Sequence, residues 1–438
     1  DFIIISGDAY VDHPSFGAAI VGRYLESLGH RVGIIPQPDW TDVGAFRSLG
    51  RPDLAFLITA GNLDSLVNHY TSGKKRRKSD AYSPGGRAGL RPDRAVITYT
   101  SRAKQAYKGV PVILGGIEAS LRRLSHYDYW SGSVRRSILL DAKADLLVYG
   151  MGERPLGEIS RRLRAGEPVS GITGIPGTLW KTKDPFPASG PADTEGAGGF
   201  TSGREVLELP PFEDLEGDGE GEAPAGRLFA ESTRIRLLNQ DPFSARVLAE
   251  RYGDWFAVQA PPARPLSTGE LDRIYALPFT RRWHPRYDSA GGVPALEEVR
   301  FSITASRGCF GGCSFCALGL HQGRIVTSRS HESILAEAVS FTRDPDFKGI
   351  IHDVGGPTAN FRVASCARQA TGGCCPDKQC LYPESCSALA ADHTDLKELL
   401  GKLRDLPGIK KVFIRSGIRY DYLLKDRDEG FFDDLVRY

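Results

Sequence analysis

Residues 306–319 read SRGCFGGCSFCALG and place three cysteines, Cys309, Cys313 and Cys316, within eight positions. Two glycines lie between the first two cysteines, and a phenylalanine precedes the third. A disulfide uses two thiols and a buried strand needs none, so the spacing indicates ligands for a metal ion or cluster. The loop follows an apolar, β-branched run at 299–305, which predicts a β-strand. The cysteines therefore lie at the C-terminal end of a strand, where βα barrels keep their active sites.

The C-x3-C-x2-C spacing suits an iron–sulfur cubane. A [4Fe-4S] cluster normally takes four thiolates, so three cysteines leave one iron open. An open iron can chelate adjacent amine and carboxylate groups, which the methionine part of S-adenosylmethionine presents. Gly308, Gly311 and Gly312 let the backbone approach such a cluster closely. A tetrahedral zinc site formed by the same cysteines and His321 is the alternative.

From Val299 onward, strand and helix patterns alternate. The sequence predicts strands at 299–305, 347–356 and 410–417, and helices at 331–343, 394–406 and from 429. Three strands and three helices amount to about half of a (β/α) barrel. We therefore expect a partial barrel, truncated at the C-terminus of this chain, in a polypeptide that continues past Tyr438. The strand at 410–417 should then lie at an open edge, and the Cys309 loop should be exposed.

The first 165 residues also alternate strands and helices. Strands are predicted at 2–6, 31–36, 53–59, 95–100, 110–116 and 144–150, nearly continuous in apolar residues, as parallel strands buried on both faces are. We therefore expect an α/β, doubly wound, Rossmann-like N-terminal domain that resembles cobalamin-binding domains. The predicted layout is a Rossmann-like domain at 1–182, a Gly/Pro/acid-rich linker or excursion at 183–227, a connecting segment at 228–298, and the first half of the barrel at 299–438.

The composition is that of an ordinary globular protein, with 41% hydrophobic and 25% charged residues among 438. Without an apolar run of membrane-spanning length or a visible export signal, we expect a cytoplasmic protein with no membrane partner. The net charge of +2 does not indicate a nucleic-acid partner. One basic run, Lys74 to Lys78, is the exception, and it is either a solvated loop tip or a phosphate or RNA contact.

A second cysteine set falls in an insertion at 361–390 of the barrel. Cys366, Cys375, Cys380 and Cys386 follow a C-x8-C-x4-C-x5-C pattern, with Cys374 as an extra thiol. Four thiolates can close either a zinc site or a second iron–sulfur cluster. The uneven spacing, without a C-x2-C pair, favours the cluster slightly, and free or disulfide-bonded thiols are a third alternative.

A polar and aromatic set follows the strand at 110–116. The residues that stand out are Glu118, Arg122, Arg123, His126, Tyr127, Asp128 and Trp130. Open α/β sheets bind ligands beyond the carboxyl ends of their strands, so this set is a candidate ligand site. A buried salt-bridge network is the alternative interpretation.

Several longer stretches resemble one known superfamily and one branch of it. The three-cysteine loop and the stretch GRIVTSRSHESILAE (323–337) resemble the radical S-adenosylmethionine (radical SAM) enzymes. Four blocks resemble the YgiQ-type radical SAM proteins, and the similarity runs nearly from end to end: SGDAYVDHPSFGAAIVGR (6–23), GGIEASLRRLSHYDYW (115–130), RGCFGGCSFC (307–316) and DVGGPTANFR (353–362).

The resemblance implies a [4Fe-4S] cluster on Cys309, Cys313 and Cys316 and S-adenosylmethionine as cofactors. It implies reductive cleavage of S-adenosylmethionine to a 5′-deoxyadenosyl radical, fed by a one-electron donor such as flavodoxin or ferredoxin. It also implies cofactor contacts from Gly355 and Gly356, because VGGP at 354–357 stands where these enzymes carry glycine-glycine-glutamate. The substrate is not implied.

Some radical SAM enzymes carry a cobalamin loop that reads D-x-H-x-x-G. Here Asp12 and His13 are adjacent, and His13 lies one residue too far from Gly17. We therefore expect no cobalamin, with His13 as an ordinary polar loop residue. The prediction is a radical SAM iron–sulfur enzyme acting on an unknown substrate; the alternative is a non-catalytic, metal-stabilised RNA-binding module.

Overall fold

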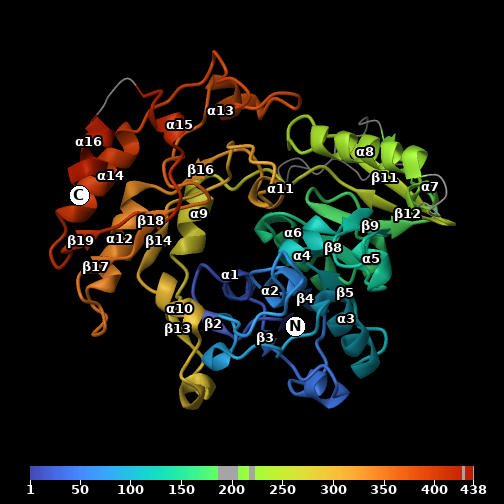
Figure 1. Cartoon of the computed structure of the whole chain (residues 1–438). Coiled ribbons are helices and arrows are strands. Elements are labelled where there is room, and N and C mark those ends of the chain that lie inside the picture. Colours follow the sequence, from blue (N-terminus) through green and yellow to red (C-terminus); the bar gives the residue numbers. More distant parts are fainter. Residues whose placement is uncertain (186–205, 217–221, 427–429, 438) are drawn as a thin grey trace. The chain divides into compact units, whose positions relative to one another are not determined.

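The computed structural model describes residues 1–185, 206–216, 222–426 and 430–437 (Figure 1). Contacts divide these residues into two compact units. Unit 1 comprises Asp1–Asp12, Phe16–Arg264 and Trp283–Pro294, and unit 2 comprises His13–Ser15, Pro265–Arg282 and Ala295–Tyr438. Among the described residues, no helix is both long and apolar enough to cross a membrane.

Unit 1 is built on a large, mostly parallel sheet. Five strands run parallel in the order β3 (Val32–Pro36), β1 (Phe2–Ser6), β4 (Ala55–Thr59), β5 (Val112–Leu114) and β8 (Leu146–Val148). The sheet continues through the antiparallel strands β9 (Thr178–Thr182), β12 (Trp255–Gln259) and β11 (Val247–Tyr252), and ends at β10 (Val206–Glu208). The expected α/β class with a large parallel sheet is confirmed.

The sheet of unit 1 is buried on both faces. All five residues of β1 are buried, and they divide between two apolar clusters: Ile3 and Ile5 pack in one, Phe2 and Ile4 in the other. Successive side chains of a strand point to opposite faces, so the two clusters cover opposite sides of the sheet. The helices of unit 1 are α1 (Gly17–Ser27), α2 (Ser65–His69), α3 (Ala95–Ala106), α4 (Gly116–Leu121), α5 (Ile138–Asp141), α6 (Glu153–Arg164), α7 (Phe212–Glu216) and α8 (Glu222–Leu238).

One predicted strand is wrong, because residues 95–100 begin helix α3. The buried side chains of α3 include Ala95, Tyr99 and Ala103, which recur every four residues. The apolar run AVITYT looks strand-like by itself, but its pattern continues with helical period into SRAKQA. The periodicity of the full window of twelve residues therefore indicates a helix, and it outweighs the five β-branched and aromatic residues of the first half.

The segment expected to connect two domains contributes strands to unit 1. β11 and β12 fall within 228–298, and both join the same sheet as the strands at 1–182. They pair as a hairpin across Gly253, whose φ of +58° suits glycine. Much of the Gly/Pro/acid-rich stretch at 183–227 lies outside the described residues.

Unit 2 contains a short three-stranded parallel arrangement. β14 (Ser302–Thr304) pairs with β18 (Asp353–Gly355), and β17 (Ile350–Ile351) pairs with β19 (Lys411–Val412). Backbone hydrogen bonds from Val354 N to Phe413 O and from His352 N to Phe301 O join the two pairs. The segments β17 and β18 therefore form the middle strand of the three, between β14 and β19. Among the described residues, β19 has no strand on its other side, and it is shorter than the predicted 410–417.

The helices of unit 2 follow the predicted pattern. Ser330 caps α12 (His331–Phe341) through its side chain, and the four leucines of α14 (Thr394–Arg404) are all buried, as their spacing predicts. The other elements are α9 (Thr268–Tyr275), α10 (Pro294–Val299), α11 (Leu318–His321), α13 (Ala367–Gly372), α15 (Tyr420–Leu423), α16 (Gly430–Arg437) and the antiparallel pair β15 (Ser306–Arg307) and β16 (Thr327–Ser328).

Candidate functional site

The three-cysteine loop leaves β15 and returns to β16 in unit 2. Gly308 begins it with a φ of +83°, and a Cβ atom there would lie 1.9 Å from the carbonyl oxygen of Ile325. Only glycine fits this close approach. The backbone N–H of Cys309 then donates to the carbonyl of Gly323 at 3.0 Å. The base of the loop is therefore closed by backbone contacts that hold Cys309 in place.

Cys309 is half-buried at the edge of an apolar cluster. Its Sγ lies 3.4 Å from Oγ1 of Thr358. The next residue, Phe310, is fully buried and stacks on Phe361 with ring centroids 3.7 Å apart. Phe315, in contrast, is 90% exposed, so the loop turns from the core toward solvent within a few residues.

A guanidinium group faces the sulfur atoms of this loop. Arg419 Nη1 donates to Sγ of Cys313 at 3.2 Å and to the carbonyl of Gly311 at 3.0 Å. A hydrogen-bonded ion pair with Asp421 raises the pKa of Arg419, and the nearby thiols of Cys313 and Cys309 add to that effect. A cationic donor beside a sulfur atom stabilises negative charge on it, as a thiolate ligand requires.

The thiols fit an iron–sulfur cluster by their chemistry, although they are not gathered as a finished ligand group. All three are half-buried on one short loop, and thiolates are the ligands that such clusters take. Within the described residues, no three His, Cys, Asp or Glu side chains are placed to hold a metal ion. The same holds for the zinc alternative, whose fourth ligand would be His321 at the end of α11.

Gly355 and Gly356 lie at the C-terminal end of β18, against the strand that leads into the cysteine loop. The carbonyl of Gly355 accepts from Ala305 N at 2.6 Å, and a Cβ on Gly356 would lie 2.7 Å from the carbonyl oxygen of Ser306. Gly356 is thus required for the close approach of the two segments, and Gly355 contributes a backbone hydrogen bond. Their role as cofactor contacts stays a prediction.

The structure brings three cysteines of the second set into one neighbourhood. Burial raises the pKa of the Cys380 thiol, and the nearby thiols of Cys366 and Cys386 raise it further. The backbone N–H of Cys386 donates to the carbonyl of Cys380 at 2.9 Å. The carbonyl of Cys375 accepts from Arg324 at 2.7 Å. The choice between a cluster, a zinc ion and free thiols stays open.

The second cysteine segment packs directly on the first. A Cβ on Gly312, between Cys309 and Cys313, would lie 1.9 Å from Oε1 of Gln379. Cys309 and Cys380 both border one apolar cluster, which consists of Phe310, Val326, Phe361, Leu381 and Tyr422. The sequence spacing reveals the two cysteine sets separately, and the structure adds that both border the same apolar cluster.

Sequence reasoning missed Arg419, which is 106 residues from Cys313 and belongs to no recognisable spacing. The signal that existed lies in DVGGPTANFR. Within that block Thr358 contacts Cys309, and Asn360 Oδ1 accepts from the backbone N–H of Arg419 at 3.0 Å. The DVGGPTANFR block therefore positions Arg419 through Asn360, in addition to carrying the two glycines at the end of β18.

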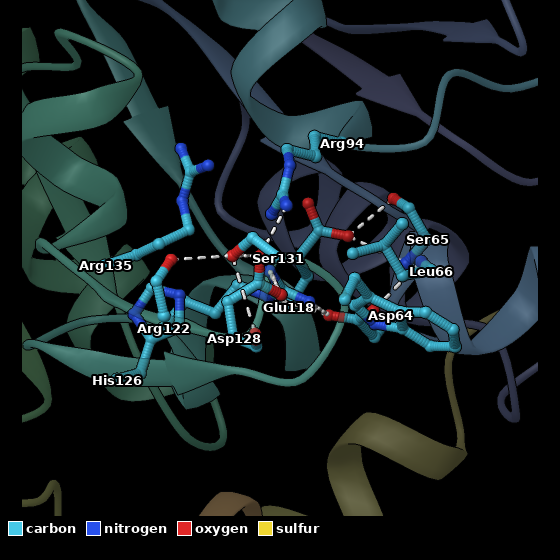
Figure 2. Close-up of polar contacts among 12 residues, drawn as sticks. Asp64, Ser65, Leu66, Arg94, Glu118, Arg122, His126, Asp128, Ser131 and Arg135 are labelled. Atoms are coloured by element: carbon cyan, nitrogen blue, oxygen red, sulfur yellow. Dashed lines mark hydrogen bonds and ion pairs between the residues drawn. The ribbon is translucent and has the colours of Figure 1, made fainter. Parts of the chain in front are cut away.

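The polar set of unit 1 forms a network of ion pairs and hydrogen bonds (Figure 2). Arg122 pairs with Asp64 at 2.7 Å, and Arg94 pairs with Asp128 at 2.5 Å. Burial raises the pKa of Glu118, and the Asp64 carboxylate raises it further. Glu118 accepts from the backbone and side chain of Ser65 at 2.8 and 2.5 Å. This favours the salt-bridge interpretation of the set over the ligand site.

Other members of the set are also engaged. Arg123 donates to Gln259 at 2.7 Å and lies 4.6 Å from the ring centroid of Tyr149. Burial lowers the pKa of His126 to about 4.

His13, at the candidate cobalamin loop, belongs to unit 2 and is fully buried. Its Nδ1 accepts from Ser15 N, and its Nε2 lies 2.7 Å from Arg281. It is therefore a packed residue rather than an ordinary polar loop residue.

Comparison with known proteins identifies the class. Residues 1–302 match the family described as Radical SAM N-terminal, and the chain therefore belongs to this family of radical SAM proteins. More narrowly, it is of the YgiQ type. UPF0313 proteins of that type from Clostridium botulinum (strain Okra / Type B1) and Clostridium perfringens (strain SM101 / Type A) are 50% and 49% identical to it over 438 residues. The whole chain aligns, but it spans only 65% and 63% of these relatives.

Two solved structures are similar to the chain. Both are of the radical SAM methyltransferase TsrM from Kitasatospora setae, one with tryptophan and an S-adenosylmethionine analogue and one with cobalamin and a [4Fe-4S] cluster. The TM-score is 0.41 for each, with 17% and 16% identity over 81% of this chain and 47% of that one. A similarity this low carries no argument about the present site. The expectation that cobalamin does not bind is nevertheless not borne out.

Proposed function

We propose that the protein is an iron–sulfur enzyme that cleaves S-adenosylmethionine reductively and acts on a substrate through the resulting radical. The observation that carries the proposal is the three-cysteine loop. It places three half-buried thiols at the end of a strand in unit 2, with the Arg419 guanidinium on one of them. Membership of the radical SAM family supports the same chemistry.

A [4Fe-4S] cluster held by these thiols would supply one electron for cleavage of the sulfur–C5′ bond of S-adenosylmethionine, which would give methionine and a 5′-deoxyadenosyl radical able to take a hydrogen atom from the substrate. Cys309, Cys313 and Cys316 would hold the cluster. Backbone groups of Gly355 and Gly356 would contact the methionine part.

The remaining residues of the site protect and adjust it. The stacked rings of Phe310 and Phe361 and the buried Tyr422 exclude water from one side of the loop. Arg419 offsets the negative charge that thiolate ligands bring. We propose a flavodoxin or ferredoxin as the one-electron donor, and the second cysteine set as the site of a second iron–sulfur cluster or a zinc ion.

The test is formation of 5′-deoxyadenosine. The protein is reconstituted anaerobically with iron and sulfide, and dithionite and S-adenosylmethionine are added. We expect 5′-deoxyadenosine and methionine in equal amounts. The variant Cys309→Ala/Cys313→Ala/Cys316→Ala should form neither, whereas Cys374→Ala, which removes the extra cysteine, should form both. Equal product from the triple variant and the unchanged protein would contradict the proposal.

A further inference from the structure

The basic run of unit 1 lies on an ordered hairpin tip. Residues 74–78 are all lysine or arginine, all five are exposed, and residues 72–79 contain no acid. Tyr70 and Arg76 form an antiparallel bridge, and Thr71 N donates to the carbonyl of Lys75 at 2.9 Å. Within the described residues, none of the five cations forms an ion pair with a carboxylate. The charge of Arg76 also helps to lower the pKa of the nearby Asp93 carboxyl, and the other four charges face solvent from a backbone held by these hydrogen bonds.

A second hairpin places aromatic rings beside this tip. It consists of β6 (His126–Asp128) and β7 (Ser133–Arg135). Tyr127 is 56% exposed and Tyr129 is 50% exposed. The Tyr129 hydroxyl donates to the carbonyl of Ser72 at 2.7 Å, and Nζ of Lys74 lies 4.8 Å from the centroid of its ring. Tyr129 thus contacts the basic tip directly, and the exposed Tyr127 lies two residues before it in the same hairpin. We call these residues the basic–aromatic surface (Lys74 to Lys78, Tyr127 and Tyr129).

Buried polar contacts anchor this hairpin through Asp128. Asp128, between the two exposed tyrosines, points inward and accepts from Arg94 and from Ser131 at 2.5 and 2.7 Å (Figure 2). Although burial opposes its ionisation, these hydrogen bonds lower the pKa of Asp128 to about 2. Because side chains alternate along a strand, anchoring Asp128 inward turns its neighbour Tyr127 outward. Tyr129, in the turn that follows β6, is held by its hydrogen bond to Ser72.

We propose that the basic–aromatic surface binds single-stranded nucleic acid. Clustered cations attract a phosphate backbone, and exposed rings stack on unpaired bases, which all present a flat face. A purely anionic partner, such as an acidic protein or a lipid surface, would use the cations and leave two half-exposed rings without a flat partner. RNA and single-stranded DNA share the recognised chemistry, and the test separates them. The inference concerns unit 1 alone and does not rest on the proposed function.

The charge test uses fluorescence anisotropy with labelled 20-nucleotide oligouridine and oligothymidine. Lys74 already contacts Tyr129, so we count four available cations. Four phosphate contacts predict an affinity about 50-fold weaker at about 200 mM than at 50 mM salt, and Lys75→Gln/Lys78→Gln, with two, should weaken only about 7-fold. The matched control is Arg47→Gln/Lys108→Gln, which removes two exposed cations elsewhere in unit 1 and should behave like the unchanged protein.

The ring test separates stacking from charge. Tyr127→Ala should weaken binding about tenfold, since it removes one stacking platform, whereas Tyr127→Phe should bind like the unchanged protein. Tighter binding of oligouridine would identify RNA as the partner, and tighter binding of oligothymidine would identify DNA.

Three results would overturn the inference. The first is no binding of either oligonucleotide at low salt, and the second is equal effects of the Lys75/Lys78 and Arg47/Lys108 variants. The third is binding to phosphatidylserine vesicles as tight as to the oligonucleotides, with no loss in Tyr127→Ala, which would show a surface that reads charge alone. The variant Cys309→Ala/Cys313→Ala/Cys316→Ala should bind the oligonucleotides as the unchanged protein does. A failure of nucleic-acid binding can therefore be told apart from a failure of the proposed enzyme activity.

Discussion

The two cysteine segments of unit 2 border one apolar cluster, yet each uses its arginine differently. In the loop at 309–316, Arg419 donates to a sulfur atom, that of Cys313, at 3.2 Å. Arg324, which precedes β16, donates instead to two backbone carbonyls of the insertion, those of Cys375 and Lys378, at 2.7 and 2.8 Å. The first arginine acts on the charge of a thiol, and the second holds the fold of the chain around the thiols. We infer a reactive centre at the first segment and a structural one at the second.

The largest difference should come from removing each set of thiols. Cys309→Ala/Cys313→Ala/Cys316→Ala should abolish 5′-deoxyadenosine formation, because no other group in the loop can hold the proposed cluster. Cys366→Ala/Cys380→Ala should leave the iron of the first loop in place. Iron content and low-temperature EPR of the reduced protein measure this. If both variants lose the same EPR signal, the two segments are not separate centres.

Removing the second set should instead act on stability. Loss of a structural metal is among the few changes that lower the free energy of unfolding by more than about 4 kcal/mol, so Cys380→Ser should do so in metal-reconstituted protein. Cys374→Ser, outside the expected ligand set, is the control and should cost less. Unfolding in urea, followed by circular dichroism, provides the measurement. A Cys380→Ser protein as stable as the unchanged one would mean that the second set holds no metal.

Much of this site could be predicted from local pattern, and the remainder depends on contacts between distant residues. Some signals are local, because each lies within one loop or one helix. They are the cysteine spacing, the Ser330 cap and the buried leucines of α14. Arg419 approaches Cys313 from 106 residues away, and the Gln379 contact with Gly312 crosses between two loops. Neither has a periodicity or spacing, because only tertiary packing brings these residues together.

The fold shows the same division between local and distant information. Strands such as β1 and β4 are recognisable because each is apolar throughout and buried on both faces. The run at 95–100 is similarly apolar and β-branched but lies on the first turns of α3, so composition alone predicts the wrong element there. The strands β10 to β12 extend the sheet of unit 1 beyond β9, and only β12 pairs with β9 itself; no local signal contains these pairings.

The insertion should be sensitive to the loss of Arg324. Arg324→Gln removes two hydrogen bonds from a charged donor to backbone carbonyls, one part-buried and one exposed, which should lower the free energy of unfolding by about 2 kcal/mol. The EPR signal of the first loop should stay unchanged. The control is Arg368→Gln, an exposed arginine of the same insertion. An altered signal with unchanged stability would reverse the roles we assign to the two arginines.

The smallest expected effect is also the most specific, and it concerns Arg419. A hydrogen bond to a cluster sulfur stabilises the more negative, reduced state, so removing it should make reduction harder. We expect Arg419→Met to lower the midpoint potential of the first cluster by about 60 mV, which is a tenfold change in the one-electron equilibrium. Arg415→Met is the matched control, because Arg415 is exposed and pairs with Glu298 at 3.1 Å. The potential is measured by EPR-monitored redox titration without S-adenosylmethionine, so the readout does not depend on turnover. Since Arg419 also pairs with Asp421, thermal unfolding of both variants shows whether the shift has a structural origin. A shift of the same size in both variants, or none in Arg419→Met, would mean that Arg419 supports the loop without acting on its charge.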